Sequence, residues 1–442
     1  MTSDLTSQWS KLLSTKRLKA DKVQAEPGRS PFNSDHDRIV FSGAFRRLAK
    51  KTQVHPLANN DHVHNRLTHS LEVACVGRSL GCRVGEQISD DLPQGTSPYD
   101  IGDIVEAACL AHDIGNPPFG HIGEEAIKHW FSSNLENNWK GAEDQFKDLA
   151  NFEGNAQGFR IINATEYRVF DGGMRLTCAT LGAFMKYPWL NGKGPKADKF
   201  GAFLSEEDFF KEVTEELGMK KLGDGYYARH PLAHLMEMAD DFCYRLLDME
   251  DAIEMGIIEW KEFHSTFEPV LGEVELSEMT AIERLRPGRR PAALRGKIIS
   301  AFIDDAAKAF ALNERDILNG EIDSLLEKCS APVRGALGAA KLVAQEKIFN
   351  HPRKIELEIG AYSVIRTLMD TISRAIAPDS KDALSSQVLK LIGPSTFSAH
   401  SESLEGVSEY ERYRRAVDFV SGMTDNYATY LSNQFNGMGG VR

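Results

Sequence analysis

Histidines and aspartates that could bind a divalent metal ion lie at three separated places in the chain. His69 stands alone, and His112 and Asp113 form an adjacent pair further on. Imidazole nitrogens and carboxylate oxygens together suit Mn, Fe, Ni or Zn and, less tightly, Mg. A fourth ligand is expected later in the chain, and Asp240 is the best candidate. Spacing alone does not separate Asp240 from its neighbour Asp241.

Sequence context distinguishes His112-Asp113 from a second pair, His36-Asp37. The second pair lies in a polar stretch that indicates a helix start, where N-capping alone explains an aspartate. The residues before His112 are mostly apolar, and the run 115–118 (GNPP) ends the helix directly after the pair. A polar pair at the end of a buried helix needs partners, because unpaired burial is costly. This context favours a metal site over a hydrogen-bonded core histidine.

A candidate acid/base pair follows at His121 and Glu124. The two residues are three apart at the start of a predicted helix, so their side chains share one face. A carboxylate beside an imidazole orients the ring and raises its basicity, as general acid/base catalysis requires. The alternative is a surface histidine beside a glutamate that is favoured by the helix dipole.

Asp240, Tyr244 and Asp248 form one stripe of a predicted helix at the spacing i, i+4, i+8. A solvated acidic face is the usual explanation of such a stripe. Tyr244 and the adjoining apolar residues Met236 and Leu247 indicate instead that part of the stripe faces inward.

Composition places the chain among ordinary globular proteins. It has 442 residues, of which 26% are charged and 42% hydrophobic, enough for roughly two or three domains. The net charge of -12 argues against attraction of the whole surface to nucleic acid or anionic membrane, although a local basic patch is compatible with it. No apolar run approaches the roughly 18 residues that span a bilayer, and the N-terminus lacks the features of a signal peptide. The cysteines show no Cys-x-x-Cys spacing, which indicates reduced thiols in a cytoplasmic protein.

Helical periodicity dominates the chain, so we expect a mostly α fold with a helical C-terminal region packed on the core. Strand-like alternation is scarce, with one short hairpin considered near 168–180. We expect an N-terminal arm at 1–37, a metal-dependent core at 38–255 and a helical C-terminal region at 256–442. The predicted helices are 38–51, 65–86, 100–113, 121–133, 153–164, 205–217, 231–253, 292–311, 313–328, 331–347, 354–376 and 408–433.

Several segments together resemble one enzyme family. The chain closely resembles the deoxyguanosine triphosphate triphosphohydrolases of the HD-domain phosphohydrolase superfamily, and the likeness covers roughly residues 28–255 and a C-terminal segment. The resemblance is specific because several motifs occur in the expected order. The segments are 42–54 (SGAFRRLAKKTQV), 66–73 (RLTHSLEV), 112–121 (HDIGNPPFGH), 239–241 (ADD) and 419–425 (FVSGMTD).

The resemblance implies an HD-domain helical core and a metal-dependent reaction. Members cleave deoxynucleoside triphosphates, usually dGTP, between the 5' oxygen and the α-phosphorus, releasing the deoxynucleoside and tripolyphosphate. Mn or Mg is the expected metal, with Ni, Fe and Zn as alternatives. The family forms homo-oligomers, often hexamers, and some members respond to nucleotides or single-stranded DNA.

The resemblance also assigns roles to individual residues. It makes the first aspartate of the 240–241 pair the ligand, and His121 and Glu124 the groups that work beside the metal. Asp248 would lie near the sugar 3'-hydroxyl, and Arg66 shares a helix face with His69 for phosphate binding. For Gln53 or Asn155 alone, a structural role explains the residue equally well. The implied metal ligands are His69, His112, Asp113 and Asp240. The implied substrate-binding residues are Arg66, Gln53, Asn155, Lys186, Tyr187, Tyr244 and Asp248. Asn116 is a further candidate, because it lies three residues beyond Asp113, close enough to touch metal-bound water.

Other mechanisms find less support in the sequence. There is no phosphate-binding P-loop motif. A Gly-x-Ser-x-Gly match at 77–81 falls within a predicted helix, whereas a nucleophile elbow needs a strand before Ser79. Direct attack by water near the metal is the simpler mechanism. Another HD phosphohydrolase, either a nucleoside monophosphatase or a cyclic phosphodiesterase, would use the same ligands. A non-catalytic nucleotide- or DNA-binding regulator would predict a missing ligand or a missing His121–Glu124 pair.

Two basic clusters are candidate binding surfaces for single strands or nucleotides. Solvated surface is the usual explanation of the first, with an anion-binding, subunit-contact or DNA role as the alternative. Stacking and charge make the second compatible with nucleotide binding, but packing explains it equally well. The first comprises Arg284, Arg286, Arg289 and Arg290, and the second Tyr410, Arg412, Tyr413, Arg414 and Arg415.

Overall fold

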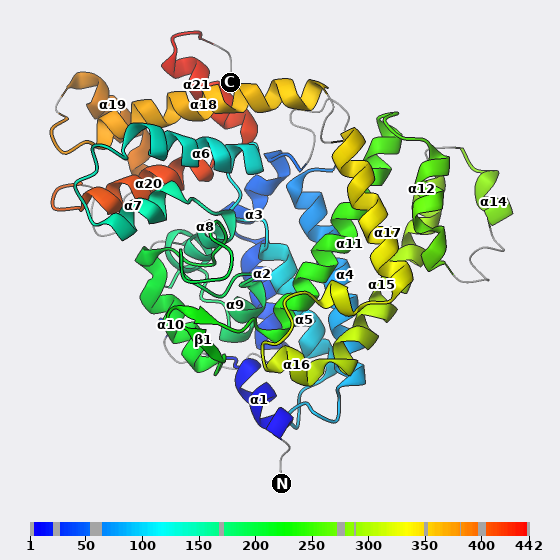
Figure 1. Ribbon diagram of the computed structural model, residues 1–442. Helices are drawn as coiled ribbons and strands as arrows, with labels where there is room; N and C mark the ends of the chain where they lie inside the picture. The colour runs from blue at the N-terminus through cyan, green and yellow to red at the C-terminus, as the bar shows by residue number, and fades with distance from the viewer. Residues whose placement is uncertain are drawn as a thin grey trace.

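The computed structural model describes residues 4–20, 27–53, 64–167, 172–271, 279–286, 289–348, 352–380, 382–396 and 404–439 (Figure 1). Within these residues helices dominate, and the named strands are β1 (Lys221–Gly223) and β2 (Tyr226–Tyr227), which form one antiparallel hairpin. The predicted mostly helical fold is therefore confirmed. The described residues contain no helix that is long and apolar enough to cross a membrane.

Three central helices position the candidate site. They are α4 (Arg66–Gln87), α5 (Pro98–Ala111) and α11 (Pro231–Glu254), which pack against one another. Glycines allow α4 and α5 to approach closely, because a Cβ on Gly81 would lie 2.9 Å from the Gly102 Cα. Asn65 and Ser97 cap the starts of α4 and α5 with their side chains, so each helix begins at a fixed residue.

The other elements surround these three helices. Before and after α5 lie α1 (Asp4–Leu12), α2 (Pro31–Val40), α3 (Gly43–Arg47), η1 (Leu48–Lys50), α6 (His121–Asn134), α7 (Glu143–Ala150), α8 (Gly154–Arg160), η2 (Ile161–Thr165), α9 (Cys178–Phe184), η3 (Leu204–Glu206) and α10 (Glu207–Glu216). After α11 come α12 (Trp260–Phe267), η4 (Glu268–Val270), α14 (Met279–Glu283), α15 (Arg290–Leu312), α16 (Glu314–Leu318), η6 (Leu325–Lys328), α17 (Ala331–Val343), η7 (Ala344–Ile348), α18 (Pro352–Ile376), α19 (Ala383–Thr396), α20 (Glu409–Ser421) and α21 (Asp425–Phe435).

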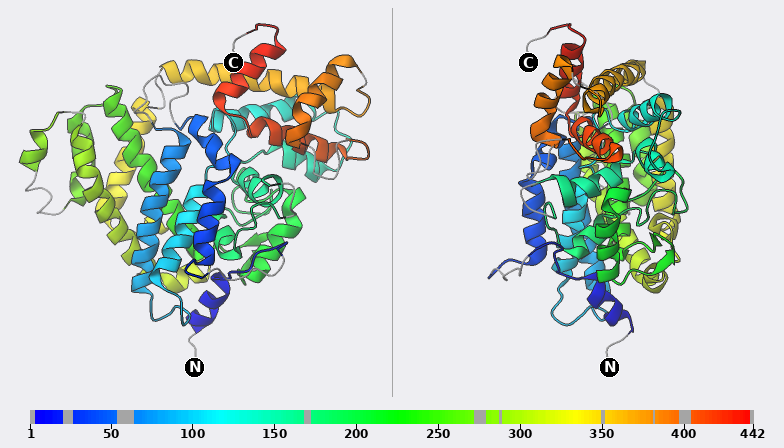
Figure 2. Two further views of the ribbon diagram at one scale, coloured as in Figure 1. Left: turned by 180° about the vertical axis from the view of Figure 1, so that it is seen from behind. Right: turned by 90° about the vertical axis from the view of Figure 1, so that its left-hand side faces the viewer.

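The buried apolar side chains form two clusters. The first joins α4, α5 and α11 to α15 and α17. The second joins α6 and α7 to the C-terminal helices α18, α20 and α21. Both figures show α18 lying along α6 at one end of the molecule (Figures 1 and 2), where Trp130 Nε1 donates a hydrogen bond of 2.7 Å to Asp370 Oδ1. The C-terminal helices therefore pack directly on the elements that follow the metal-site motif. The predicted domain boundaries remain a prediction.

The helices predicted around the site are confirmed. The predicted helix 313–328 is wrong, because α16 ends at Leu318 and η6 begins only at Leu325. Two further predicted helices prove to be broken in two. The predicted helix 38–51 is wrong because α2 ends at Val40 and Ser42 caps α3 by accepting a hydrogen bond from Phe45 N. The predicted helix 408–433 is interrupted after Ser421, and Thr424 caps α21 in the same way. In both cases a hydroxyl residue restarts the helix, which apolar periodicity does not detect.

The N-terminal arm and the hairpin near 168–180 also differ from expectation. Ser30 caps α2 and Pro31 occupies its first turn, so His36-Asp37 lies inside a helix rather than at its start. Residues 168–171 lie outside the described residues. Over 172–177 the chain forms turns and a bridge between Thr177 and Arg17, and α9 then begins at Cys178. The predicted hairpin is therefore wrong in the part that the structure describes.

Candidate metal centre and active site

The three central helices bring His69, His112 and Asp240 together. The His69 Nε2 atom lies 3.1 Å from Asp240 Oδ1, and His112 Nε2 lies 3.6 Å from the same oxygen. Ligand atoms of the three residues all lie within 4.8 Å of one another. Two imidazole nitrogens and a carboxylate oxygen at this spacing fit a divalent transition metal ion.

Second contacts orient these side chains. The Nδ1 atom of His112 lies 2.6 Å from the Cys109 carbonyl oxygen, so Nδ1–H donates there and Nε2 is left as the ligand atom. Burial disfavours a charged Asp240, but the imidazoles of His112 and His69 outweigh it, and the pKa of this carboxyl lies below its usual value. Asp240 therefore remains a carboxylate, the form that binds metals.

Asp113 lies beside this cluster. Its Oδ1 is 3.6 Å from His112 Nε2 and accepts a hydrogen bond from Asn116 Nδ2. Its Oδ2 is 2.8 Å from Arg66 Nη1. Burial raises the pKa of Asp113, but the charge of Arg66 and of the histidines outweighs it and lowers the pKa below its usual value. Its role as a ligand remains a proposal.

The structure distinguishes Asp240 from Asp241, which sequence spacing alone did not. Asp240 contacts the histidines, whereas Asp241 Oδ2 accepts a hydrogen bond of 3.0 Å from Arg245 Nη2 on the next turn of α11. The arrangement favours Asp240 as the ligand.

The predicted acid/base pair forms at the start of α6. The His121 Nδ1 atom lies 3.4 Å from Glu124 Oε2, and the imidazole is 82% exposed while the carboxylate is buried. Glu124 Oε1 also accepts a hydrogen bond of 3.0 Å from Gly154 N, which anchors it to α8. Burial raises the pKa of Glu124, but the bond with His121 outweighs it and lowers the pKa. An accessible imidazole thus rests on a fixed carboxylate, as proton transfer requires.

Backbone packing holds the loop that connects the His112-Asp113 pair to His121 at the start of α6. A Cβ on Gly115 would lie 2.0 Å from the Gly154 carbonyl oxygen, so glycine allows the loop to rest directly on α8. Phe119 has φ of +66° and Gly120 has φ of +61°, and this left-handed turn leads into α6. A Cβ on Gly120 would lie 2.6 Å from Arg66 Nη2. The turn therefore brings the start of α6 against Arg66, the residue that pairs with Asp113.

A cavity of about 360 Å³ lies over this site, a size suited to a nucleotide. Its lining includes nearly all of the predicted site residues. His69 is buried and does not line the cavity, and neither does Asp248, which is buried one turn beyond Tyr244 on α11. The predicted residues in the lining are Gln53, Arg66, His112, Asp113, Asn116, His121, Glu124, Asn155, Lys186, Tyr187, Asp240 and Tyr244.

The side chains of the predicted substrate-binding residues Gln53, Asn155 and Lys186 differ in their contacts within the chain. The Gln53 Oε1 atom is buried and accepts no hydrogen bond from the described residues. Asn155 Nδ2 donates a hydrogen bond of 3.0 Å to Glu153 Oε1. Lys186 Nζ lies 3.4 Å from Glu237 Oε1. Gln53 therefore has a buried acceptor with capacity left for a ligand.

Sequence reasoning missed part of the lining. Lys199 and Glu153 face the same cavity, and Lys199 Nζ donates a hydrogen bond of 3.2 Å to Glu153 Oε1. Burial and the charge of Glu124 raise the pKa of Glu153. Lys199 lies in a connector with no helical period, so no local pattern marks it. The other lining residues that were not predicted are Gly154, Met236 and Asp241.

The rival features have structural explanations. Ser79 lies inside α4 and donates a hydrogen bond to the Cys75 carbonyl oxygen, so no nucleophile elbow forms. The described arginines between 284 and 290 are exposed or half-buried, and Arg290 donates to the carbonyls of Leu285 and Glu283. In the second basic cluster Arg414 is buried and donates to Gln157 Oε1. This favours packing over an exposed nucleotide-binding face.

Comparisons with known proteins agree with the geometry. The HD domain model matches residues 66–168. A "Deoxyguanosinetriphosphate triphosphohydrolase-like protein" of Pseudomonas aeruginosa is 44% identical over 97% of this chain and 98% of its own length. One of the same name from Synechocystis is 36% identical over 98% of this chain and 99% of its own. A "Deoxyguanosinetriphosphate triphosphohydrolase" of Yersinia enterocolitica is 32% identical, with coverages of 90% and 92%.

Proposed function

Since the chain belongs to the deoxyguanosinetriphosphate triphosphohydrolase family of HD-domain phosphohydrolases, we propose that it hydrolyses deoxynucleoside triphosphates, with dGTP as the preferred substrate. The products are the deoxynucleoside and tripolyphosphate.

One observation carries this proposal. The candidate metal ligands, the His121–Glu124 pair and the two lysines Lys186 and Lys199 all belong to one site, around a cavity of about 360 Å³. A triphosphate needs several cationic partners, and a phosphoryl reaction needs a proton-transfer group near them. The cavity provides both kinds of group.

His69, His112, Asp113 and Asp240 would hold the divalent ion, expected to be Mn or Mg, which polarises a phosphate oxygen and stabilises the developing charge. Arg66 keeps Asp113 charged and fixes its orientation. Asn116 holds the other oxygen of the same carboxylate. These two contacts keep the carboxylate in one orientation before substrate arrives.

The lysines prepare the cavity for phosphate. Lys186 lies beside the half-buried carboxylate of Glu237, and Lys199 lies beside the buried carboxylate of Glu153, which keeps both lysines charged within the lining. The pKa of each lysine is raised, because these carboxylates outweigh the effect of burial. The ammonium groups of Lys186 and Lys196 lie 5.9 and 5.5 Å from the centre of the Tyr187 ring.

The reaction transfers one proton in a simple balance. The oxygen of water bonds to the α-phosphorus, the bond from the α-phosphorus to the 5' oxygen breaks, and one proton of the attacking water passes to the 5' oxygen. His121 carries this proton, because Glu124 engages Nδ1 and leaves Nε2 as the nitrogen for transfer.

Further properties are proposed from family membership. We place the protein in the cytoplasm and expect a homo-oligomer, with the hexamer as the family's frequent form. A nucleotide or single-stranded DNA effector is part of the same proposal. Tyr244 and Asp248 would contact the sugar, and Gln53 and Asn155 the sugar or phosphate side.

Product analysis tests the proposal. The purified protein with Mn²⁺ is given each of the four dNTPs, and phosphorus products are resolved by ³¹P NMR. Tripolyphosphate with the deoxynucleoside is the expected result, fastest with dGTP. Monophosphate with pyrophosphate, or free phosphate, would contradict the proposed reaction.

A further inference from the structure

The C-terminal segment reaches the site from the far end of the sequence. Helix α20 ends at Ser421 and α21 begins at Asp425, whose side chain is buried and 2% exposed. Thr424, not Asp425, caps α21 with its side chain. The Asp425 carboxylate is therefore available for contacts outside its own helix.

The Asp425 carboxylate joins two separate loops. Its Oδ1 accepts a hydrogen bond of 2.9 Å from Phe119 N. Its Oδ2 accepts a hydrogen bond of 2.9 Å from Thr52 N and another from Thr52 Oγ1. Hydrogen bonds to a charged acceptor are among the stronger ones in proteins.

Both loops lead directly into residues of the cavity. Phe119 lies two residues before His121 and has φ of +66°, a conformation that non-glycine residues rarely adopt. Thr52 precedes Gln53, whose Oε1 is buried without a hydrogen-bond partner in the described residues. The Asp425 carboxylate thus holds two segments that lead into the cavity lining. One is the turn at Phe119 that precedes His121, and the other is the segment that ends with Thr52 and Gln53.

Lys51 makes a second connection between the C-terminal helices and the loops beside the cavity. Lys51 Nζ donates hydrogen bonds to the carbonyl oxygens of Ser421, at 2.7 Å, and of Asn116. Lys51 is 3% exposed. The last turn of α20 is therefore tied to the loop that follows Asp113.

We infer that Asp425 is a positioning residue, which fixes His121 through the Phe119 turn and Gln53 through Thr52. This inference rests on the proposed function, since it concerns the same site. Asp425 does not line the cavity, so it acts through the residues that do. The C-terminal helices accordingly contribute to the geometry of the reaction as well as to the core.

The first test is Asp425→Asn in the full-length chain. Asparagine keeps the shape, but its amide can accept from only one of the two loops and turns an N–H group toward the other. We expect kcat to fall about 100-fold, because a displacement of about 1 Å has this effect. Mn²⁺ binding should remain as in the wild type. An unchanged kcat would overturn the inference.

Asp418→Asn is the matched control. Asp418 is another buried carboxylate of the C-terminal helices, but it bonds to Arg160 and Gln157 and does not line the cavity. This variant should lower the melting temperature and leave kcat within about twofold when assayed well below that temperature. An equal loss of kcat in both variants would show general loosening of the C-terminal helices and overturn the inference.

A double-mutant cycle shows whether Asp425 acts through His121. Single-turnover rates at saturating substrate, where the effect through Gln53 on KM does not enter, are compared for His121→Ala, Asp425→Asn and the double variant. If Asp425 positions His121, the double variant should be no slower than His121→Ala. A double variant whose loss of rate equals the product of the two single losses would contradict the inference. If Asp425→Asn does not fold, Thr52→Val removes only the hydroxyl contact and should raise KM several-fold; an unchanged KM would overturn the Gln53 part.

A substrate-free readout separates this inference from the proposed function. The ring-proton resonances of His121, assigned by comparison with His121→Ala, should shift in Asp425→Asn and remain in place in Asp418→Asn. If the wild type turned over no dNTP while these shifts appeared, the proposed function would fail and the positioning would stand. Unshifted resonances would overturn the positioning.

Discussion

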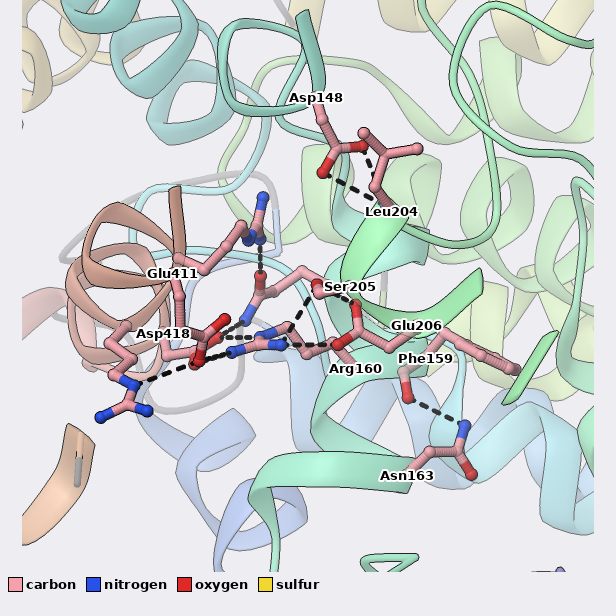
Figure 3. A network of polar contacts seen from close by, with 12 residues as sticks. Asp148, Phe159, Arg160, Asn163, Leu204, Ser205, Glu206, Glu411 and Asp418 are labelled. Atoms are coloured by element: carbon pink, nitrogen blue, oxygen red, sulfur yellow. Dashed lines mark hydrogen bonds and ion pairs between the residues drawn. The ribbon is translucent and has the colours of Figure 1, made fainter. Parts of the chain in front are cut away.

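Two regions of this molecule bury charged groups and balance them in different ways. In the network between α8 and α20, Arg160 Nε and Nη2 each lie 2.9 Å from an oxygen of Asp418, and Nη1 donates to Glu206 (Figure 3). Arg414 lies beside them, with its guanidinium 3.5 Å from the centre of the Phe203 ring. There the chain provides both signs of charge.

At the candidate metal centre the chain provides an excess of acceptors. Asp240 faces the imidazoles of His69 and His112, and Asp113 pairs with Arg66. Buried charge is stable only when it is paired. The comparison indicates that the network pairs its charges within the chain, whereas the candidate metal centre could hold a cation from solution. We therefore propose that a bound cation distinguishes the candidate catalytic cluster from the structural one.

The largest expected effect is on catalysis alone. His121→Ala removes the accessible imidazole but no candidate ligand, so turnover should fall by about 10²- to 10⁴-fold. Mn²⁺ content and melting temperature should stay close to those of the wild type. Activity is measured by product formation and metal content by elemental analysis. Unchanged turnover would remove His121 from the mechanism.

An effect on stability alone is expected in the network. Arg160→Met leaves Asp418 and Glu206 buried without their shared cation, so the free energy of unfolding should fall by about 3–5 kcal/mol. Mn²⁺ affinity should be unchanged, because the network contains no candidate ligand. Denaturant titration and calorimetry measure the two quantities. A loss of metal affinity with little loss of stability would reverse the distinction between the regions.

A smaller effect is expected at the rim of the catalytic cavity. Lys199→Ala should raise KM for dNTP about tenfold through the loss of one phosphate partner. Steady-state kinetics with Lys193→Ala as the exposed-lysine control measure it, since Lys193 pairs with Asp224 and does not line the cavity. An equal KM in both variants would exclude Lys199 as a substrate contact.

The smallest effect concerns the half-buried His64, whose charge the chain also balances itself. Burial lowers the pKa of His64, but hydrogen bonds with Asp251 and Glu72 outweigh it and raise the pKa to about 10. Its contribution to stability is complete below the unfolded pKa of about 6.5 and is lost as the pH rises through 10. The melting temperature should therefore decline more between pH 6.5 and 10 in the wild type than in His64→Gln. Parallel declines would contradict this assignment.

The sequence predicted those parts of the site that depend on local spacing. His121 and Glu124 lie one turn apart, and the central helices have strong apolar periodicity, so both could be recognised in advance. Lys199 and Glu153 meet through tertiary packing of a connector on α8, and no local pattern indicates that contact. The segment 419–425 was recognised as part of a family pattern. The bonds of Asp425 to Thr52 and Phe119 depend on the folded chain.

The same distinction explains the errors in the fold. Ser42 and Thr424 each restart a helix within a stretch of continuous apolar periodicity. The aromatic and basic residues near 410–415 were ambiguous in sequence, because a buried arginine network and a nucleotide-binding face use the same residue types. Burial of Arg414 favours the network.

The most direct test of the metal-site assignment is calorimetric titration of Mn²⁺ into the metal-free protein, compared between the wild type, Asp240→Ala and Asp241→Ala. We expect about one tight site per chain in the wild type and in Asp241→Ala, and its loss in Asp240→Ala. Tight binding that survives in Asp240→Ala would contradict the assignment of the cation to this cluster.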